Sequence, residues 1–178
     1  MKNWCKEMTG VRIAVTGTPG VGKTSFCAQM KWSTTSVKSL AEKYDCIGPI
    51  DEDRSAPIDI EKLVGKLSWS GDDLQLVDGH LSHLLPVDAV ILIRCHPETL
   101  RERLISRNYS EQKVNENVEC ELIGVIAAEC QKLPCLELDS AKGIQSMIED
   151  AERWIADGFK HHRPNEAIDW IAEIHGDD

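Results

Sequence analysis

The chain lacks several features that would assign it to a specialised class of protein. It has no run of about eighteen apolar residues, so no membrane-spanning helix is expected. Its seven cysteines include no Cys-x-x-Cys pair, so we predict reduced thiols rather than a zinc site or a disulfide framework. No apolar segment follows the first lysines, which argues against a secretory signal and makes a cytoplasmic location the expectation.

Basic residues are also scarce relative to acidic ones. The 178 residues include 20 Lys and Arg against 30 Asp and Glu, which gives a net charge of −10. An acidic surface repels a phosphate backbone, so the composition gives no strong signal for nucleic-acid binding, although it suits a basic protein partner. Internal repeats and low-complexity segments are absent, and the length predicts one domain spanning residues 1–178.

Short apolar runs alternate with longer helical patterns along the chain. The predicted strands are Arg12–Thr16, Leu74–Asp78, Ala89–Arg94 and Cys135–Asp139, with a weaker candidate at Thr34–Val37. The predicted helices are Gly22–Trp32, Asp59–Leu67, Pro97–Arg107, Ser110–Gln131, Ala141–Asp157 and Asn165–His175, the last with Ile168, Ile171 and Ile174 near one face. This alternation predicts an α/β fold in which helices cover both faces of a parallel sheet.

The stretch "GTPGVGKT" at residues 17–24 matches the P-loop pattern between a predicted strand and a predicted helix. Gly17 and Gly20 allow positive φ angles and the close approach of a phosphate group, so that successive N–H groups form an anion-binding nest. Lys23 would reach the β- and γ-phosphates, and the Thr24 hydroxyl would bind Mg²⁺. The sequence therefore predicts a nucleoside triphosphate site.

Two polar residues follow the strand at 74–78 and are candidates for the same site. Asp78 ends that strand and would help to position Mg²⁺, or alternatively would cap a following helix. His80 would orient an attacking or transferring oxygen atom, or else serve a structural role.

The small size favours a phosphotransferase among P-loop proteins. An Asn-Lys-x-Asp segment for reading guanine is absent, which argues against a GTPase. A phosphotransferase needs cationic side chains on a closing element, and the helix at 97–107 offers Arg101, Arg103 and Arg107. Each of the three could instead be an ordinary surface arginine paired with Glu98 or Glu102.

Longer motifs make the chain resemble the adenylate kinase isoenzyme 6 family, an archaeal-type adenylate kinase family also described as ribosome-assembly factors. The motifs are the P-loop, "YDCIGPIDEDR" at 44–54, "DGH" at 78–80, "RERLISRNYSEQKVNENVECE" at 101–121 and "AIDW" at 167–170. The resemblance implies a three-layer P-loop NTPase sandwich with a five-stranded parallel sheet, like that of nucleoside monophosphate kinases. It also implies a monophosphate-binding insert at about 37–55 and a short lid at about 106–116.

The activity implied by the resemblance is Mg²⁺-dependent transfer of the γ-phosphate of ATP to AMP or dAMP, with slow ATP hydrolysis. An alternative is an ATPase that assists assembly of the small ribosomal subunit through a basic ribosomal protein. A third reading is a small-metabolite kinase of the shikimate or gluconate kinase type, which shares the loop but needs other acceptor residues.

The resemblance also implies roles for individual residues. Nucleotide-binding residues would be Gly17, Gly20, Val21, Gly22, Lys23, Thr24, Ser25, Arg107 and Tyr109. Catalytic roles would fall to Lys23, Asp78, His80 and Arg107, with Thr24 and Asp78 at the metal. The loop at 139–142 would lie at the adenine base. For the acceptor phosphate the insert offers Lys38 and Lys43, which could equally be solvated charges. The carboxylates at 51–53 could approach the nucleotides through water and Mg²⁺, or could form a solvated acidic loop.

Overall fold

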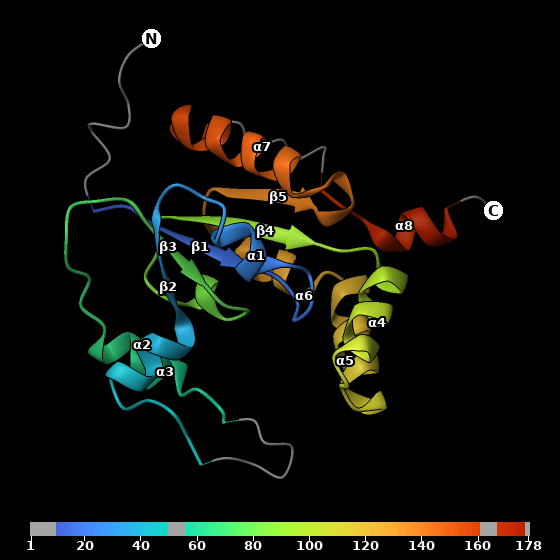
Figure 1. Cartoon of the computed structure of the whole chain (residues 1–178), viewed down its shortest axis with the longest axis horizontal. Coiled ribbons are helices and arrows are strands. Elements are labelled where there is room, and N and C mark those ends of the chain that lie inside the picture. The colour runs from blue at the N-terminus through green and yellow to red at the C-terminus, as the bar shows by residue number, and fades with distance from the viewer. Residues whose placement is uncertain (1–9, 50–55, 161–166, 177–178) are drawn as a thin grey trace.

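The computed structural model describes residues 10–49, 56–160 and 167–176, and it contains a five-stranded sheet flanked by helices (Figure 1). The strands are β1 (Arg12–Thr16), β2 (Ser33–Ser36), β3 (Gln75–Asp78), β4 (Ala89–Arg94) and β5 (Cys135–Asp139). Their spatial order is β2-β3-β1-β4-β5, and every pairing is parallel. The predicted α/β fold class and all five predicted strands are confirmed.

Eight α-helices connect or follow the strands in the described part of the chain. They are α1 (Lys23–Cys27), α2 (Val37–Lys43), α3 (Ile60–Lys66), α4 (Pro97–Ser106), α5 (Glu111–Leu122), α6 (Val125–Glu129), α7 (Ile144–Ala156) and α8 (Trp170–His175). Local chemistry sets several of their starts, because the side chains of Ser36, Asp59 and Ser110 accept hydrogen bonds from the first turns of α2, α3 and α5. Proline is the first residue of α4, where its missing N–H has no cost.

The apolar core is divided by the sheet into two layers. Successive strand residues point to opposite faces, so Ile13 and Val15 pack with α1, α4, α5 and α7, whereas Ala14 packs with α2 and α3. Figure 1 shows α7 along one side of the sheet and α2 and α3 toward the other. Both faces of the sheet are therefore buried, as the unbroken apolar runs of β1 and β4 predict.

Two predicted helices are shorter in the structure than the sequence suggests. The helix predicted at 22–32 ends at Cys27, because Gln29 and Met30 make the tighter hydrogen bonds of a turn that leads into β2. The helix predicted at 110–131 is interrupted by Gly124, which has a φ of 68° and separates α5 from α6. In both cases a helix does form within the predicted range. It ends earlier than predicted because the chain must turn to reach the next element.

The predicted C-terminal helix begins later and buries a different side chain. Asp169 caps α8 at Trp170, and residues 165–166 lie outside the described residues. The predicted apolar face is wrong, since Ile171 and Ile174 are 45% and 42% exposed whereas Trp170 is 3% exposed. A single tryptophan, held by polar contacts described below, anchors this helix.

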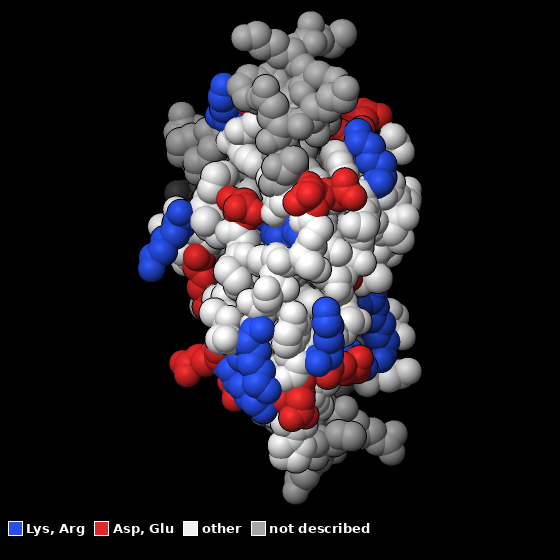
Figure 2. Space-filling model, turned by 90° about the vertical axis from the view of Figure 1, so that its left-hand side faces the viewer, with Lys and Arg blue, Asp and Glu red and all other residues white. Residues whose placement is uncertain are grey.

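The predicted insert and lid fall on α2 and on the α4–α5 connection. Residues 50–55 of the insert lie outside the described part of the chain, and the lid segment runs from the end of α4 into α5. No described helix is long and apolar enough to cross a bilayer, and the described cysteines are free thiols. Figure 2 shows basic and acidic side chains interspersed on the face that it presents.

Candidate functional site

A cleft of about 770 Å³ collects most of the residues predicted for the site. It lies beside the loop after β1, with α2 and the segment after β3 on its other walls, and the α4–α5 turn reaches it as well. The predicted residues that line it are Gly20, Gly22, Lys23, Thr24, Ser25, Asp78, His80, Arg107 and Tyr109. Gly17 and Val21 do not line the cleft, and the Val21 side chain belongs to the core.

The backbone of the phosphate loop depends on glycine at two crowded positions. The φ angles of Gly17 and Gly20 are 136° and 99°, which L-residues with side chains rarely adopt. A Cβ atom at Gly17 would collide with the carbonyl oxygen of Ile93, and one at Gly20 would lie 2.9 Å from Cδ1 of Leu100. The positive φ angles predicted from the sequence are present, and the packing of β4 and α4 leaves no room for side chains.

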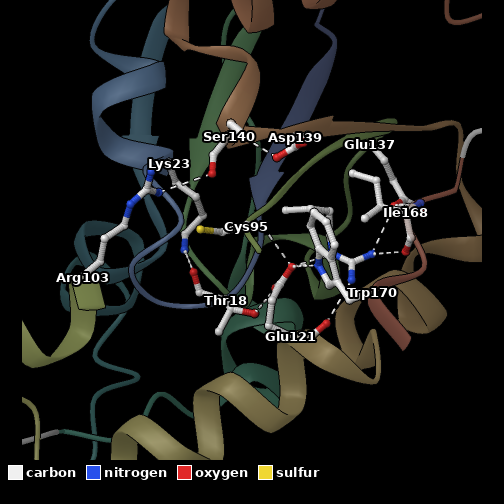
Figure 3. Close-up of polar contacts among 12 residues, drawn as sticks. Thr18, Lys23, Cys95, Arg103, Glu121, Glu137, Asp139, Ser140, Ile168 and Trp170 are labelled. Carbon is white, nitrogen blue, oxygen red and sulfur yellow. Dashed lines mark hydrogen bonds and ion pairs between the residues drawn. The ribbon is translucent and has the colours of Figure 1, made fainter. Parts of the chain in front are cut away.

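The ammonium group of Lys23 is held across the mouth of the loop. Its Nζ donates hydrogen bonds to the carbonyl oxygens of Gly17 and Thr18, at 2.8 and 3.0 Å (Figure 3). Burial lowers the pKa of Lys23 to about 8; the positive charge of Arg107 contributes, and the charges of Asp78 and Glu121 oppose the shift. The lysine is thus a desolvated cation at the point where an anionic ligand would enter the loop.

This pKa predicts that ATP affinity decreases as the pH rises above about 8. Only the protonated amine attracts the triphosphate, so above its pKa the free protein must take up a proton on binding, and affinity falls by up to about tenfold per pH unit. Calorimetric titrations in buffers of different ionisation enthalpy would measure both the affinity and the proton uptake. Binding that is independent of pH between about 7 and 9.5, with no proton uptake, would contradict the assignment.

The two predicted metal ligands lie within hydrogen-bonding distance of each other. Thr24 Oγ1 donates to Oδ2 of Asp78 at 2.8 Å, because β3 lies next to β1 in the sheet. Asp78 caps no helix, since the next 3₁₀ turn starts after Leu81. A hydroxyl and a carboxylate fit Mg²⁺, which takes few protein ligands and keeps waters and phosphate oxygens. Among the described residues no cluster of three acidic, histidine or cysteine side chains would hold a metal alone.

Two histidines follow Asp78, and their surroundings differ. His80 lines the cleft, where desolvation and then the charges of Lys23 and His83 lower its pKa. His83 is buried and is held by Thr16 and Glu129, each 2.9 Å from one of its ring nitrogens. At neutral pH His80 is therefore an uncharged imidazole that lines the cleft, whereas His83 is structural.

The three arginines proposed for the lid have different positions. Arg107, at the C-terminal cap of α4, lines the cleft, and its charge acts on Lys23. Arg101 instead donates to the Asn115 side chain at 2.9 Å. Arg103 donates to the Val21 carbonyl at 3.3 Å and to Ser140 Oγ at 3.4 Å, so it links the phosphate loop to the predicted adenine loop (Figure 3).

The wall of the cleft opposite the phosphate loop comes from the predicted insert and neighbouring segments. Lys38 lines it, whereas Lys43 lies over the Tyr44 ring, with its Nζ 5.3 Å from the ring centroid. Further lining side chains come from the predicted insert, although sequence reasoning did not single them out: Val37, Glu42 and Ile47. Sequence reasoning missed the lining side chains outside the predicted segments, which are Ser36, Ala56, Ile58 and Leu81. The carboxylates considered at 51–53 lie outside the described residues.

A glycine-rich loop after the central strand, a buried lysine and an adjacent Thr–Asp pair define this molecule as a P-loop protein of the α/β class. A family described as "AAA domain" matches residues 13–124. The chain is 40% identical over 172 residues to the protein named "Putative adenylate kinase" from Archaeoglobus fulgidus, which covers 91% of this chain and 93% of the relative. The identically named protein from Pyrococcus furiosus is 36% identical over 176 residues, with coverages of 89% and 90%.

The chain therefore belongs to the family of archaeal proteins named "Putative adenylate kinase". A solved gluconokinase from Sinorhizobium meliloti aligns with a TM-score of 0.55 over 85% of this chain and 94% of its own, at 14% identity, which shows a shared fold alone. The resemblance to this archaeal family is confirmed. The link to isoenzyme 6 and to ribosome assembly stays a prediction.

Proposed function

We propose that this protein is a nucleoside monophosphate kinase that transfers the γ-phosphate of ATP to AMP or dAMP. The observation that carries the proposal is the cleft itself, which has the phosphate loop on one side and Lys38 with apolar side chains on the other. A donor triphosphate and an acceptor phosphate can therefore meet in one cleft. The names of the relatives support the same reaction.

In this proposal the chain acts by positioning and electrostatics. An acceptor phosphate oxygen attacks the γ-phosphorus, and the bond from that phosphorus to the β–γ bridging oxygen breaks, so that ADP leaves with the electron pair. Lys23 and Arg107 would neutralise the charge that develops on the transferring group. Mg²⁺ bound at Thr24 and Asp78 would supply further charge neutralisation. The acceptor phosphate is already an anion, so neutral His80 need only orient it.

The proposal is tested by incubating the pure protein with ATP, Mg²⁺ and each nucleoside monophosphate in turn. Formation of ADP together with the acceptor diphosphate, greatest with AMP or dAMP, is the expected result. Parallel reactions with shikimate and gluconate separate this activity from that of a small-metabolite kinase. Absence of turnover with every monophosphate would refute the kinase proposal.

Lys38 is the proposed contact for the acceptor phosphate, and Lys43 provides a matched control on the same helix. We expect Lys38→Ala to raise the KM for AMP by about tenfold, since one charge-assisted contact is lost, while the KM for ATP is unchanged. Lys43→Ala should leave both values unchanged, because its side chain lies over Tyr44 and not in the cleft. Steady-state kinetics with each substrate varied would measure the difference. Equal KM values for AMP in the two variants would show that Lys38 does not contact the acceptor phosphate.

ATP hydrolysis without an acceptor is proposed as a secondary activity. Neutral His80 faces the cleft and can accept a hydrogen bond from a water molecule directed at the γ-phosphate.

A basic small-subunit ribosomal protein is proposed as a partner, and the feature that favours it is the net charge of −10. That hypothesis predicts hydrolysis stimulated by such a protein at low salt, measured as phosphate release. If the ribosomal protein neither bound this chain nor changed its rate of ATP hydrolysis, the partner hypothesis would be refuted and the kinase proposal would be unaffected.

A further inference from the structure

A buried carboxylate lies behind the phosphate loop, where three distant parts of the chain meet (Figure 3). Glu121, in the last turn of α5, is 3% exposed. Its Oε2 accepts a hydrogen bond from Thr18 Oγ1 at 2.6 Å. Its Oε1 accepts bonds from Arg94 Nε at 2.7 Å, from the Cys95 backbone N–H at 3.1 Å and from Trp170 Nε1 at 3.1 Å. One carboxyl group therefore joins the phosphate loop, the end of β4 and α8.

The C-terminal segment depends on this network for its position. Arg94 Nη1 donates to the Ile168 carbonyl at 3.1 Å, and Glu137 accepts from the Ile168 backbone N–H at 3.2 Å. The buried Trp170 ring also packs edge-on against His96, with ring centroids 5.4 Å apart. No described residue of the C-terminal segment (167–176) lines the cleft, so an effect of this segment on a ligand in the cleft would act at a distance.

Thr18 is the point at which the network meets the phosphate loop. Its carbonyl oxygen accepts a hydrogen bond from Lys23 Nζ, while its hydroxyl donates to Glu121. A bound phosphate that draws the Lys23 ammonium away would break its hydrogen bond to the Thr18 carbonyl oxygen. The hydroxyl group of the same residue is bonded to Glu121, so this change can reach the carboxylate. Because both carboxyl oxygens of Glu121 belong to one rigid group, a rotation caused at Thr18 also changes the bond to Trp170.

We propose that Glu121 is a positioning residue that couples the conformation of the phosphate loop to the docking of α8. The C-terminal segment thereby becomes part of the nucleotide site without touching it. The proposal rests on the proposed function only in requiring that the loop binds a nucleotide. Coupling of this kind is reciprocal. If the docked α8 holds Thr18 in the conformation that binds nucleotide, bound nucleotide stabilises the docked α8 by the same factor.

The first test removes the indole donor while keeping an aromatic ring. Trp170→Phe should weaken the binding of Mg·ADP, measured by calorimetry at a temperature where circular dichroism shows a folded protein, by about five- to tenfold. Ile171→Ala is the matched control, since this neighbour on the same helix is 45% exposed. Its Mg·ADP affinity should equal that of the wild-type protein.

The second test asks whether the effect passes through the carboxylate. Glu121→Gln keeps the shape of the side chain but removes its charge, and it should weaken Mg·ADP binding by itself. In that background Trp170→Phe should have little further effect, because residues coupled through one network are not additive. Hydrogen exchange at α8 should slow on addition of Mg·ADP in the wild-type protein and not in Glu121→Gln.

Two outcomes would overturn the coupling. In one, Trp170→Phe lowers thermal stability but binds Mg·ADP with wild-type affinity, which is the behaviour of a purely structural anchor. In the other, the double variant loses Mg·ADP affinity by the product of the two single-variant factors, which means that the Glu121 and Trp170 substitutions act independently. A wild-type protein that binds no adenine nucleotide would refute the proposed function as well as the coupling, whereas normal wild-type binding with either outcome above refutes the coupling alone.

Discussion

Replacing Lys23 by methionine should reduce both ATP affinity and phosphoryl transfer, with kcat/KM falling by about a thousandfold. Methionine has a similar length and no charge, so it fits the buried space but cannot attract the β- and γ-phosphates. The carbonyl oxygens of Gly17 and Thr18 lose their shared donor, which alters the free loop rather than the core. Calorimetry with ATP and initial-rate measurements with AMP would quantify the two losses.

The matched control for this experiment is Lys31→Met. Lys31 is an exposed residue that forms an ion pair with Glu152 at 3.0 Å, so its loss should change stability by at most about 1 kcal/mol and leave the kinetics unchanged. Thermal unfolding of both variants would verify that each is folded. Wild-type ATP affinity and turnover in Lys23→Met would show that the loop is not the site of nucleotide binding.

Replacing Arg107 by alanine should have the second-largest effect, a decrease in kcat of about a hundredfold or more. The guanidinium lines the cleft at the end of α4, where it can neutralise charge that grows as the phosphoryl group moves. Because that charge is greatest in the transition state, kcat should fall more than the KM for ATP rises. Arg107→Lys keeps the charge without the planar fork and should recover only part of the rate.

Arg101→Ala is the control, because Arg101 lies on the same helix and bonds to Asn115 instead of facing the cleft. Its kcat should match that of the wild-type protein. Arg103 would be a poor control, since its loss would free the Val21 carbonyl in the phosphate loop. If Arg107→Ala and Arg101→Ala had the same kcat, the lid arginine would have no role in transfer.

The strands were predictable because burial on both faces leaves a strong local signal. The runs "RIAVT" and "AVILIR" contain mostly apolar, β-branched or aliphatic residues, and their observed bounds equal the predicted ones. Helix ends were less predictable, since they depend on where the chain must turn. The glycine at 124 reads as one weak helix former in the sequence, but in the structure its left-handed conformation separates α5 from α6.

Within the site, local motifs predicted the phosphate loop but could not distinguish similar residues at a distance from it. The helix pattern alone offered Arg101, Arg103 and Arg107 for the site, and only the family resemblance singled out Arg107. In the structure, Arg101 bonds to Asn115, Arg103 bonds to the phosphate loop, and Arg107 lines the cleft. Lys38 and Lys43 were separated in the same way. The direction of each side chain determines whether it lines the cleft. That direction depends on which neighbours pack against the helix.

The printed chain was therefore enough to place the phosphate loop, the parallel sheet and the Thr24–Asp78 pair, since each follows from a local pattern or from the ends of adjacent strands. It was not enough to find the lining side chains outside the predicted insert, such as Ile58 and Leu81. Nor did it reveal the contacts of the buried Glu121, whose partners Thr18, Arg94 and Trp170 lie 103, 27 and 49 residues away in the sequence. Contacts between residues so far apart arise only when the sheet and its helices pack, because no local pattern records which side chains will meet.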